Sequence, residues 1–333
     1  MAKVPSLSVI IITHNNGANL PRTIESLREQ TYQDFELLIV DDGSTDGTWE
    51  LIDQMTWQRL RAHRNETPRG EAAAINQALE WAEGEFIALH RSGDVSNPKR
   101  FAKQIERMRR GRTLGAIGSY VDWVDEAGRL LRRWEPPTGH KAILLQLEQE
   151  GEALTLQGVP VMVVQGSMMF RFDALEEVGG LREELGLAAV MDLWRRLGET
   201  YKLANIKEVL YTATFNPDDP MFGEYFEGRI YAALALQLAE ERAQHQQEQT
   251  NFEEAVKTIT TGREERLRGI ARRVERASNY MRWAETFENW GDGASEHVRE
   301  MWLRAVAAWP FNPEVWRFAA RQLFGREREE QQK

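Results

Sequence analysis

Polar side chains follow three short apolar runs near the start of the chain, each at the point where the run ends. The three groups are Thr13-His14-Asn15, Asp41-Asp42-Gly43-Ser44 and His90–Asp94. Hydroxyls and carboxylates can hydrogen-bond the base and ribose of a nucleotide, and an arginine can neutralise its phosphates. A turn rich in Asp, Gly and Ser is by itself a common connection between a strand and a helix. The three groups form a nucleotide site only if the fold brings them together.

The surrounding pattern predicts a fold that does so. Runs rich in Val, Ile and Leu alternate with helical periodicity such as that of Glu71–Ala82, which is typical of βαβ units and a largely parallel sheet. In such sheets ligands bind outside the carboxyl ends of the strands. The predicted strands are Leu7–Ile12, Phe35–Val40, Arg59–Ala62, Glu85–Leu89, Ala116–Val124, Val161–Phe170 and Tyr201–Tyr211.

Composition excludes several classes of protein. The 333 residues carry 42 basic and 52 acidic side chains, a net charge of −10, which argues against a nucleic-acid binder. Cysteine is absent, so thiol nucleophiles, disulfides and thiolate metal sites are excluded. No apolar run approaches the roughly 18 residues of a membrane-spanning helix. We therefore expect a soluble, cytoplasmic protein.

An ordered series of motifs resembles one enzyme family. The chain from about residue 6 to residue 217 is similar to the family 2 glycosyltransferases, whose fold is the GT-A fold, a Rossmann-like mixed α/β sheet. The motifs that carry the resemblance are Ser8–Asn15, Ser26–Leu37, Val40–Thr48, Ala74–Leu79, Gly84–Ala88, Gly166–Arg171, Gly179-Gly180, Asp192–Leu197 and Leu210-Tyr211.

The resemblance implies inverting transfer of a sugar from a nucleoside diphosphate-sugar, most simply a UDP-sugar, to a hydroxyl of a glycan or glycoconjugate acceptor in polysaccharide biosynthesis. It places Thr13 and Asp42 on the base and ribose, with Asn15, Asp41 and Ser44 beside them. It places Arg69 and Asn76 on the segment that closes over the nucleotide.

The chain departs from the family at the metal motif. The Asp-x-Asp of the family falls on Arg91-Ser92-Gly93, and only the following Asp94 is acidic. Divalent ions that bridge diphosphates need several oxygen ligands. We therefore expect no bound metal ion, and we expect Arg91, with His90 as a second positive group, to stabilise the leaving diphosphate.

Two further departures affect the acceptor side. The position of the family's general base holds Val190, and Asp192 lies about 200° further around the helix axis. The family's Arg-x-His after the last strand is replaced by Thr214-Phe215-Asn216. A base would have to be recruited from Glu183, Glu184 or Asp94.

Two hypotheses follow from these losses. In the first, the protein is a metal-independent or weakened transferase in which Arg91, Asp94 and Glu184 serve the reaction. In the second, it is a catalytically inactive relative that binds a nucleotide, a glycan or a partner enzyme. Loss of a general base costs about 10²–10⁴-fold in rate, which gives the second hypothesis weight.

The remainder of the chain reads as helical. We expect a GT-A-like domain over residues 1–220 and an all-α tail over 221–333 that resembles a tetratricopeptide pair and carries five of the eleven Trp residues. So few helices cannot bury their apolar faces alone, so the tail must pack on the first domain or form a homodimer. Peripheral membrane contact stays open, and Arg129, Arg132 and Arg133 could attract an anionic or lipid-linked acceptor. The predicted helices are Tyr225–Thr258, Glu264–Trp290, Ser295–Trp309 and Pro313–Phe324.

Overall fold

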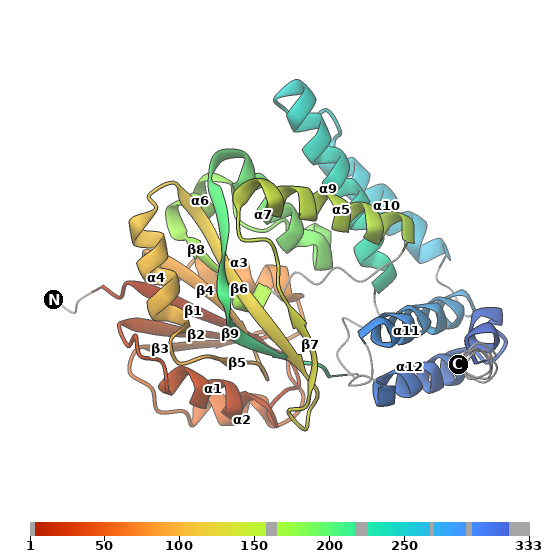
Figure 1. Cartoon of the computed structure of the whole chain (residues 1–333), viewed down its shortest axis with the longest axis horizontal. Coiled ribbons are helices and arrows are strands. Elements are labelled where there is room, and N and C mark those ends of the chain that lie inside the picture. Colours follow the sequence, from red (N-terminus) through yellow and green to blue (C-terminus); the bar gives the residue numbers. More distant parts are fainter. Residues whose placement is uncertain (1–3, 158–164, 217–224, 267–269, 291–294, 320–333) are drawn as a thin grey trace, which may run out of the picture.

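The fold is built on one mixed β-sheet, covered by helices on both faces and followed by a helical C-terminal region (Figure 1). The structure is a computed structural model, and it describes residues 4–157, 165–216, 225–266, 270–290 and 295–319. Within these residues the strand order is β3-β2-β1-β4-β8-β6-β9-β5, with β7 paired to β6. The strands are β1 Leu7–Thr13, β2 Phe35–Asp41, β3 Leu60–Arg64, β4 Phe86–Arg91, β5 Val95–Ser96, β6 Leu114–Val124, β7 Leu130–Trp134, β8 Met169–Arg171 and β9 Lys202–Thr214.

The first four long strands run parallel, because β1 pairs in parallel with β2 and β4, and β2 pairs in parallel with β3. In register, Thr13 lies opposite Asp41 and Ile12 lies opposite Arg91. The carboxyl ends of β1, β2 and β4 therefore meet at one edge of the sheet. This confirms the convergence that the sequence pattern predicts for the three polar groups.

Helices pack on the two faces according to the alternation of apolar residues along the strands. Ile10 and Leu38 belong to a core shared with α3 and α7, whereas Val9, Ile11 and Leu37 belong to a second core shared with α1 and α4. The helices of this part are α1 Leu20–Arg28, α2 Thr48–Asp53, α3 Glu71–Leu79, α4 Arg100–Arg110, α5 His140–Gln157, α6 Phe172–Glu177 and α7 Ala189–Thr200, with the 3₁₀ segments η1 Gln165–Ser167 and η2 Glu183–Ala188.

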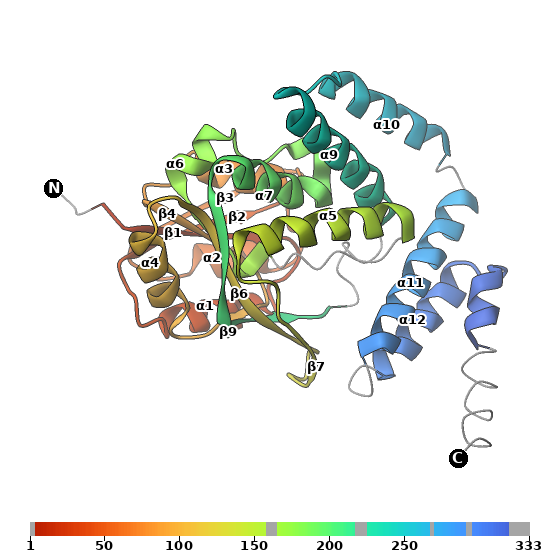
Figure 2. The ribbon, with the colours of Figure 1, turned by 45° about the horizontal axis from the view of Figure 1, so that its top comes forward.

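The C-terminal region contains α9 Tyr225–His245, α10 Phe252–Arg266, α11 Ile270–Trp290 and α12 Ser295–Ala308, and residues 313–319 are also helical. Figures 1 and 2 both show α11 and α12 beside the end of the sheet that carries β7. They share a core with β6 and β9, in which Trp123, Tyr211 and Phe215 meet Met281 and Phe287. Of the two arrangements that we expected for the tail, the structure shows packing on the first domain, and the homodimer stays a prediction.

Two predictions about elements are wrong. Tyr225–Thr258 is not one helix, because the chain turns between α9 and α10. There Gln246 has φ +58°, and the Glu241 carboxylate accepts from the backbone N–H groups of Gln249 and Thr250, at 2.8 Å each. The predicted strand Val161–Phe170 is also wrong in its described part, because Gln165–Ser167 form the 3₁₀ segment η1 and the strand β8 begins only at Met169.

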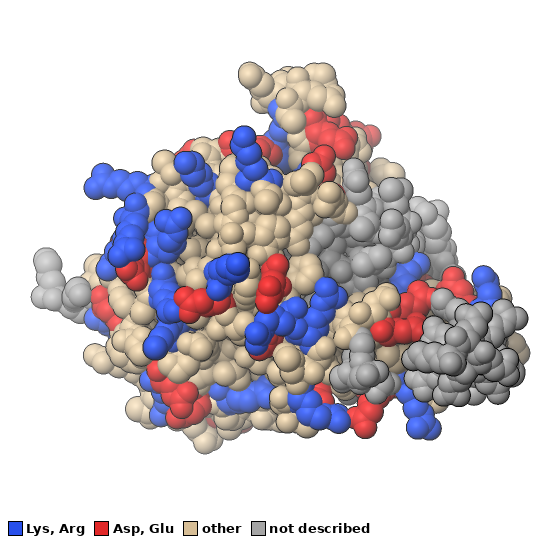
Figure 3. Space-filling model, in the orientation of Figure 1, with Lys and Arg blue, Asp and Glu red and all other residues tan. Residues whose placement is uncertain are grey.

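Several other expectations fall at the limits of the described residues. The predicted domain boundary near residue 220 lies outside them, as do the start of Val161–Phe170 and the charged C-terminal end. No helix of the described residues is long and apolar enough to cross a membrane. In the face shown in Figure 3, Lys and Arg gather over α4, where Arg107, Arg109 and Arg110 form the exposed last turn.

Candidate functional site

The first part of the candidate site is a hydrogen-bonded rim at the ends of β1 and β2. The Asn15 backbone N–H donates to Ser44 Oγ at 2.8 Å, and the Ser44 N–H donates to Asp41 Oδ1 at 3.1 Å. Thr13 and Asp41 lie side by side in register and are buried. Asn15 adopts φ +47°, a left-handed conformation that Asn tolerates better than most residues. The structure therefore brings Thr13, Asn15, Asp41 and Ser44 together.

Two polar atoms of this rim are buried without a hydrogen-bond partner among the described residues: Thr13 Oγ1 and Asp41 Oδ2. The nearest cation to Asp41 Oδ2 is Arg64, whose Nε lies 3.7 Å away. Buried polar groups in proteins are nearly always satisfied, so such atoms at one edge of the sheet point to a ligand that completes them.

Asp42 organises the loop that precedes α3. Its Oδ1 accepts from Asn65 Nδ2 and from the Arg69 backbone N–H, and its Oδ2 accepts from the Gly70 N–H, each at 2.8 Å. Gly70 has φ +93°, a conformation that glycine adopts readily. Asp42 thus fixes the backbone of Arg69, whose side chain is exposed. The Asp42 carboxylate itself already accepts three hydrogen bonds.

The second part of the site is the elbow, residues 90–94, between β4 and β5. Asp94 is buried, and both of its oxygens are bonded: Tyr211 Oη donates to Oδ2 at 2.7 Å, and the Thr214 backbone N–H donates to Oδ1 at 2.8 Å. Tyr211 Oη also accepts from the Arg91 backbone N–H at 3.1 Å. Burial raises the pKa of Asp94 to about 6, although Arg91 acts in the opposite direction. The carboxyl group is used to hold the elbow.

His90 cannot supply the second positive charge that we expected of it. It is buried, its ring centroid lies 5.1 Å from that of Tyr211, and its Nδ1 lies 2.9 Å from the Arg91 carbonyl oxygen. Burial, together with the nearby Arg100, lowers the pKa of His90 to about 3. His90 is therefore neutral at physiological pH, and this part of the sequence hypothesis is wrong.

Arg91 remains the cation at the elbow. Its side chain is 24% exposed, and its Nε lies 4.0 Å from Glu71 Oε1 at the start of α3. Arg91 is the last residue of β4 and pairs with Ile12 in register, so it lies at the same edge of the sheet as Thr13. A positive group at this edge of the sheet is what a diphosphate requires.

Asn76, predicted to close over the nucleotide, lies next to the candidate bases Glu183 and Glu184 and apart from the rim. The Asn76 amide donates to the Leu181 carbonyl oxygen and to Glu183 Oε1, and its oxygen accepts from the Leu181 N–H. Asn76 therefore links α3 to η2, and its contact with a nucleotide stays a prediction. Glu184 is exposed on η2. The structure does not place Asn76 or Glu184 in the hydrogen-bond network of the rim.

Val190 and Asp192, the two positions that the family resemblance singles out on α7, are both buried. Val190 is buried in the core between α7 and the sheet. Asp192 is completely buried and forms an ion pair with Arg196 at 2.7 Å, with Arg182 at 3.7 Å. Asp192 is thus part of the structural framework.

Sequence reasoning missed two residues that support the elbow. Arg100 is fully buried and donates to the carbonyl oxygens of Leu89 and Met168, at 3.0 and 3.2 Å. Its spacing from Gln104 and Met108 on α4 placed it on the inner helix face, a signal that could have identified it. Tyr211 appeared only as part of a motif, and nothing local shows that its hydroxyl reaches the elbow.

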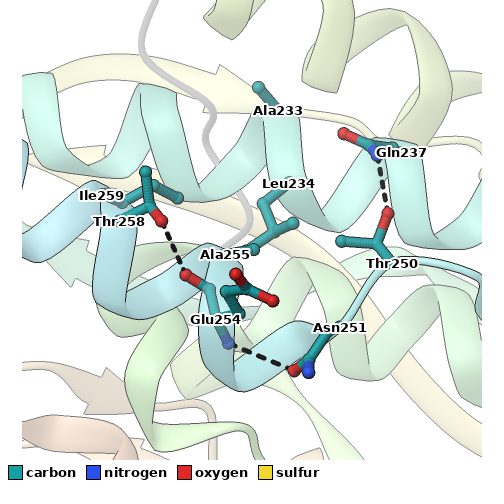
Figure 4. A pocket seen from close by; sticks show the side chains of 9 residues that line it. All are labelled: Ala233, Leu234, Gln237, Thr250, Asn251, Glu254, Ala255, Thr258 and Ile259. Carbon is teal, nitrogen blue, oxygen red and sulfur yellow. Dashed lines mark hydrogen bonds between the residues drawn. The ribbon is translucent and has the colours of Figure 1, made fainter.

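The structure also has a groove between α9 and α10, away from the strand ends (Figure 4). None of the predicted site residues lines it. The lining residues are Ala233, Leu234, Gln237, Thr250, Asn251, Glu254, Ala255, Thr258 and Ile259.

Comparisons with known proteins agree with the fold and with the motifs. The family model described as "Glycosyl transferase family 2" matches residues 8–179. The putative glycosyltransferase EpsE of Bacillus subtilis is 29% identical over 220 residues, which are 64% of this chain and 74% of EpsE. The uncharacterized glycosyltransferase MJ1057 of Methanocaldococcus jannaschii is 27% identical over 248 residues, 72% of this chain and 81% of that protein.

Among solved structures, the crystal structure of S. aureus TarS 1–349 in complex with UDP-GlcNAc superposes with a TM-score of 0.55 at 18% identity, covering 91% of this chain and 87% of TarS 1–349. The crystal structure of TarS 1–349 in complex with UDP has a TM-score of 0.54 at 16% identity and covers 94% and 91% of the two chains. At this identity the likeness shows a shared fold.

Proposed function

The chain belongs to glycosyl transferase family 2, and we propose that it transfers a sugar from a nucleoside diphosphate-sugar to a glycan or glycoconjugate hydroxyl. The observation that carries the proposal is the pair of buried, unsatisfied oxygens, Thr13 Oγ1 and Asp41 Oδ2, at the same carboxyl edge of the sheet as the cation Arg91. A nucleotide offers N–H and O–H donors for the oxygens and a diphosphate for the cation. Family relatives named as glucosyltransferases that use UDP-Glc, such as WfaP of Escherichia coli, support a UDP-sugar donor.

In this proposal the reaction proceeds without a divalent metal ion. The donor set does not fit one: Arg91 replaces a carboxylate, and both oxygens of Asp94 already accept hydrogen bonds from Tyr211 and Thr214. Arg91 instead carries the charge that stabilises the leaving nucleoside diphosphate. A donor placed where charge develops contributes about 10²–10³-fold to kcat.

The proposal also needs a general base that accepts the proton of the acceptor hydroxyl. Glu184 is the exposed carboxylate on η2, and Glu183 beside it is held by Asn76. The Asp94 carboxyl group is buried and bonded, which favours Glu184 as the group that accepts the proton of the acceptor hydroxyl. The alternative of an inactive nucleotide- or glycan-binding relative is favoured by Val190 at the family's base position.

A turnover assay separates these alternatives. The full chain is incubated with UDP-, GDP- and dTDP-sugars and a mixture of glycan acceptors, with and without a chelator, and release of nucleoside diphosphate is measured. Acceptor-dependent release that persists in chelator and falls in Arg91→Ala supports the transferase. Nucleotide binding without release in any mixture supports the inactive relative.

The proposal has three lesser parts. We infer that the boundary between the two domains lies near residue 220 and that the protein works in the cytoplasm, a reducing compartment that suits a chain without cysteine. We also infer a homodimer through the C-terminal helices. The exposed apolar side chains of Leu303, Phe311 and Trp316, with 48, 76 and 54% of their surface exposed, support it. Sedimentation of the full chain tests it.

A further inference from the structure

Three arginines of the β6–β7 hairpin look alike in sequence but differ in their surroundings. Arg129 forms ion pairs with Asp125 at 2.5 Å and with Glu296 at 2.7 Å. Arg133 forms an ion pair with Asp122, with hydrogen bonds of 2.7 and 2.9 Å. The charges of both side chains are therefore already neutralised by neighbouring carboxylates.

Arg132 lies between two indole rings instead. Its guanidinium carbon is 5.5 Å from the ring centroid of Trp134 on β7 and 5.7 Å from that of Trp290 at the end of α11. Among the described residues, no carboxylate forms an ion pair with it. Stacking on aromatic rings fixes the guanidinium plane but leaves its N–H donors available at the plane's edge.

A second donor without an acceptor lies beside Arg132. Trp123 pairs with Arg132 in register, so the two side chains lie next to each other on one face of the hairpin. Trp123 is 5% exposed, and its Nε1–H has no hydrogen-bond partner among the described residues. Two neighbouring donors, one of them charged, lack the acceptor that buried or stacked donors normally have.

We propose that Arg132, held between Trp134 and Trp290, binds an anionic group, a phosphate or a carboxylate, of the glycan acceptor. The proposal rests on the proposed transferase function and specifies its acceptor class. The site uses both parts of the chain, because Trp134 comes from the sheet and Trp290 from the helical region that packs beside it (Figure 2).

The position of the site suits an acceptor. Trp123 pairs with Ala213 on β9, and β9 in turn pairs with β5, directly after the elbow. Three strand spacings separate β7 from the elbow, roughly 14 Å at the usual interstrand distance. An acceptor lying across the strand ends could thus place a hydroxyl at the elbow and an anionic group at Arg132.

Binding of small anions tests the proposal. The full chain is saturated with UDP, so that the nucleotide site is filled, and titrated by calorimetry with methyl glucuronide, geranyl diphosphate and neutral methyl glucoside. The titrations are repeated in Arg91→Ala, so that capture of the diphosphate at the elbow is recognised. Arg132→Met keeps an unbranched stem between the indoles and removes the charge, and Arg133→Ala is the matched control.

We expect at least one anion to bind more tightly than the glucoside, and Arg132→Met to weaken that binding roughly 10- to 100-fold, the value of a hydrogen bond to a charged group. Arg133→Ala should change it by less than about twofold, because exposed ion pairs contribute little. Arg132→Lys should bind the anion more tightly than Arg132→Met but less tightly than the wild type, since lysine keeps the charge and lacks the planar guanidinium. Thermal melting of each variant establishes that it is folded.

The two anionic probes identify which kind of anionic group the acceptor carries. Glucuronide binding indicates an acidic sugar in the acceptor, and geranyl diphosphate binding indicates a lipid diphosphate. The proposal is overturned if neither anion binds better than the glucoside, or if Arg132→Met binds them as the wild type does. Failure of UDP to bind would instead contradict the proposed function. The anion titrations of the wild type and Arg132→Met can still be compared in that case, so the two proposals fail independently.

Discussion

Two buried carboxylates at the carboxyl edge of the sheet differ in the hydrogen bonds that they make. Asp41 at the end of β2 leaves Oδ2 without a hydrogen bond, next to the equally unsatisfied Thr13 Oγ1. Asp94 after β4 uses both oxygens inside the protein, on Tyr211 and Thr214. Both side chains are almost inaccessible to solvent, so burial alone does not distinguish a binding group from a structural one. The difference lies in which hydrogen bonds remain to be made.

The comparison bears on our proposal that the reaction proceeds without a divalent metal ion. At the rim two buried oxygens, Thr13 Oγ1 and Asp41 Oδ2, have no hydrogen-bond partner among the described residues. At the elbow Asp94 is bonded to Tyr211 and Thr214, while Ser92 Oγ and His90 Nε2 have no hydrogen-bond partner among the described residues. The neutral His90 and the buried Arg100 both pack against Tyr211, and the Arg91 side chain is 24% exposed. The hydrogen bonds of Tyr211 with Asp94 and with the Arg91 backbone N–H therefore fix the position of Arg91.

Removal of that cation should give the largest effect. We expect Arg91→Ala to lower kcat for sugar transfer about 10²–10³-fold, because the leaving diphosphate loses its charge stabilisation. Steady-state kinetics with the preferred nucleotide-sugar measures it. Arg109→Ala, an exposed arginine at the end of α4, is the control. A kcat within about threefold of wild type, a change too small for a lost charge contact, would show that Arg91 does not act on the diphosphate.

The neutral state of His90 predicts a pH dependence of stability. Its pKa falls from 6.5 to about 3 on folding, so its contribution to stability is complete above pH 6.5 and is lost as the pH falls toward 3. Compared with His90→Gln, the wild type should lose about 3 kcal/mol of unfolding free energy between pH 7 and pH 4.

Urea unfolding at several pH values measures this difference. The raised pKa of Asp94, about 6, acts in the opposite direction between pH 4 and pH 6, and it is present in both proteins. Parallel pH profiles for wild type and His90→Gln would mean that His90 is not held neutral by burial.

Removal of the Tyr211 hydroxyl should lower the free energy of unfolding, because this hydroxyl holds the elbow together. Tyr211→Phe removes the hydrogen bonds that Tyr211 Oη makes with Asp94 Oδ2 and with the Arg91 backbone N–H, which should cost about 1–3 kcal/mol in urea unfolding. It should also lower kcat while leaving UDP affinity intact, since Tyr211 acts by positioning Arg91. An equal loss of UDP affinity would place Tyr211 in the binding site instead.

The smallest effect concerns the rim. Thr13→Val removes a hydroxyl without a partner, so we expect unchanged or slightly higher stability but UDP binding weakened about two- to tenfold. Thr23→Val is the matched control. Its hydroxyl donates to the Asp94 carbonyl oxygen and accepts from the Gly93 N–H, so stability should fall by about 1–3 kcal/mol. Similar stability losses in both variants would show that Thr13 Oγ1 is satisfied within the protein.

The fold was largely predictable because its signals are local. Buried parallel strands such as β1 and β2 are continuous apolar runs, and the polar residues after them mark the ligand edge. The α9–α10 turn was missed because a polar stretch of good helix formers contains neither Gly nor Pro at the break. β7 was missed because its existence depends on pairing with β6, a distant partner.

The site was predictable only in part, for a similar reason. The rim residues Thr13, Asn15, Asp41 and Ser44 belong to contiguous motifs. Other features of the site are set by contacts between residues 11 to 120 positions apart in the sequence. These features are the neutral state of His90, the burial of Arg100 and the support that Tyr211 gives the elbow. Burial and long-range hydrogen bonds decide their charge and role, and residue type alone does not reveal either.

Calorimetric titration of the full chain with UDP, in Mn²⁺, in Mg²⁺ and in a chelator, tests the central claim most directly. If Arg91 takes the place of the metal ion, the affinity for UDP is the same in all three conditions and falls in Arg91→Ala. A marked rise in affinity with either metal, or no loss in Arg91→Ala, would contradict that account of the elbow.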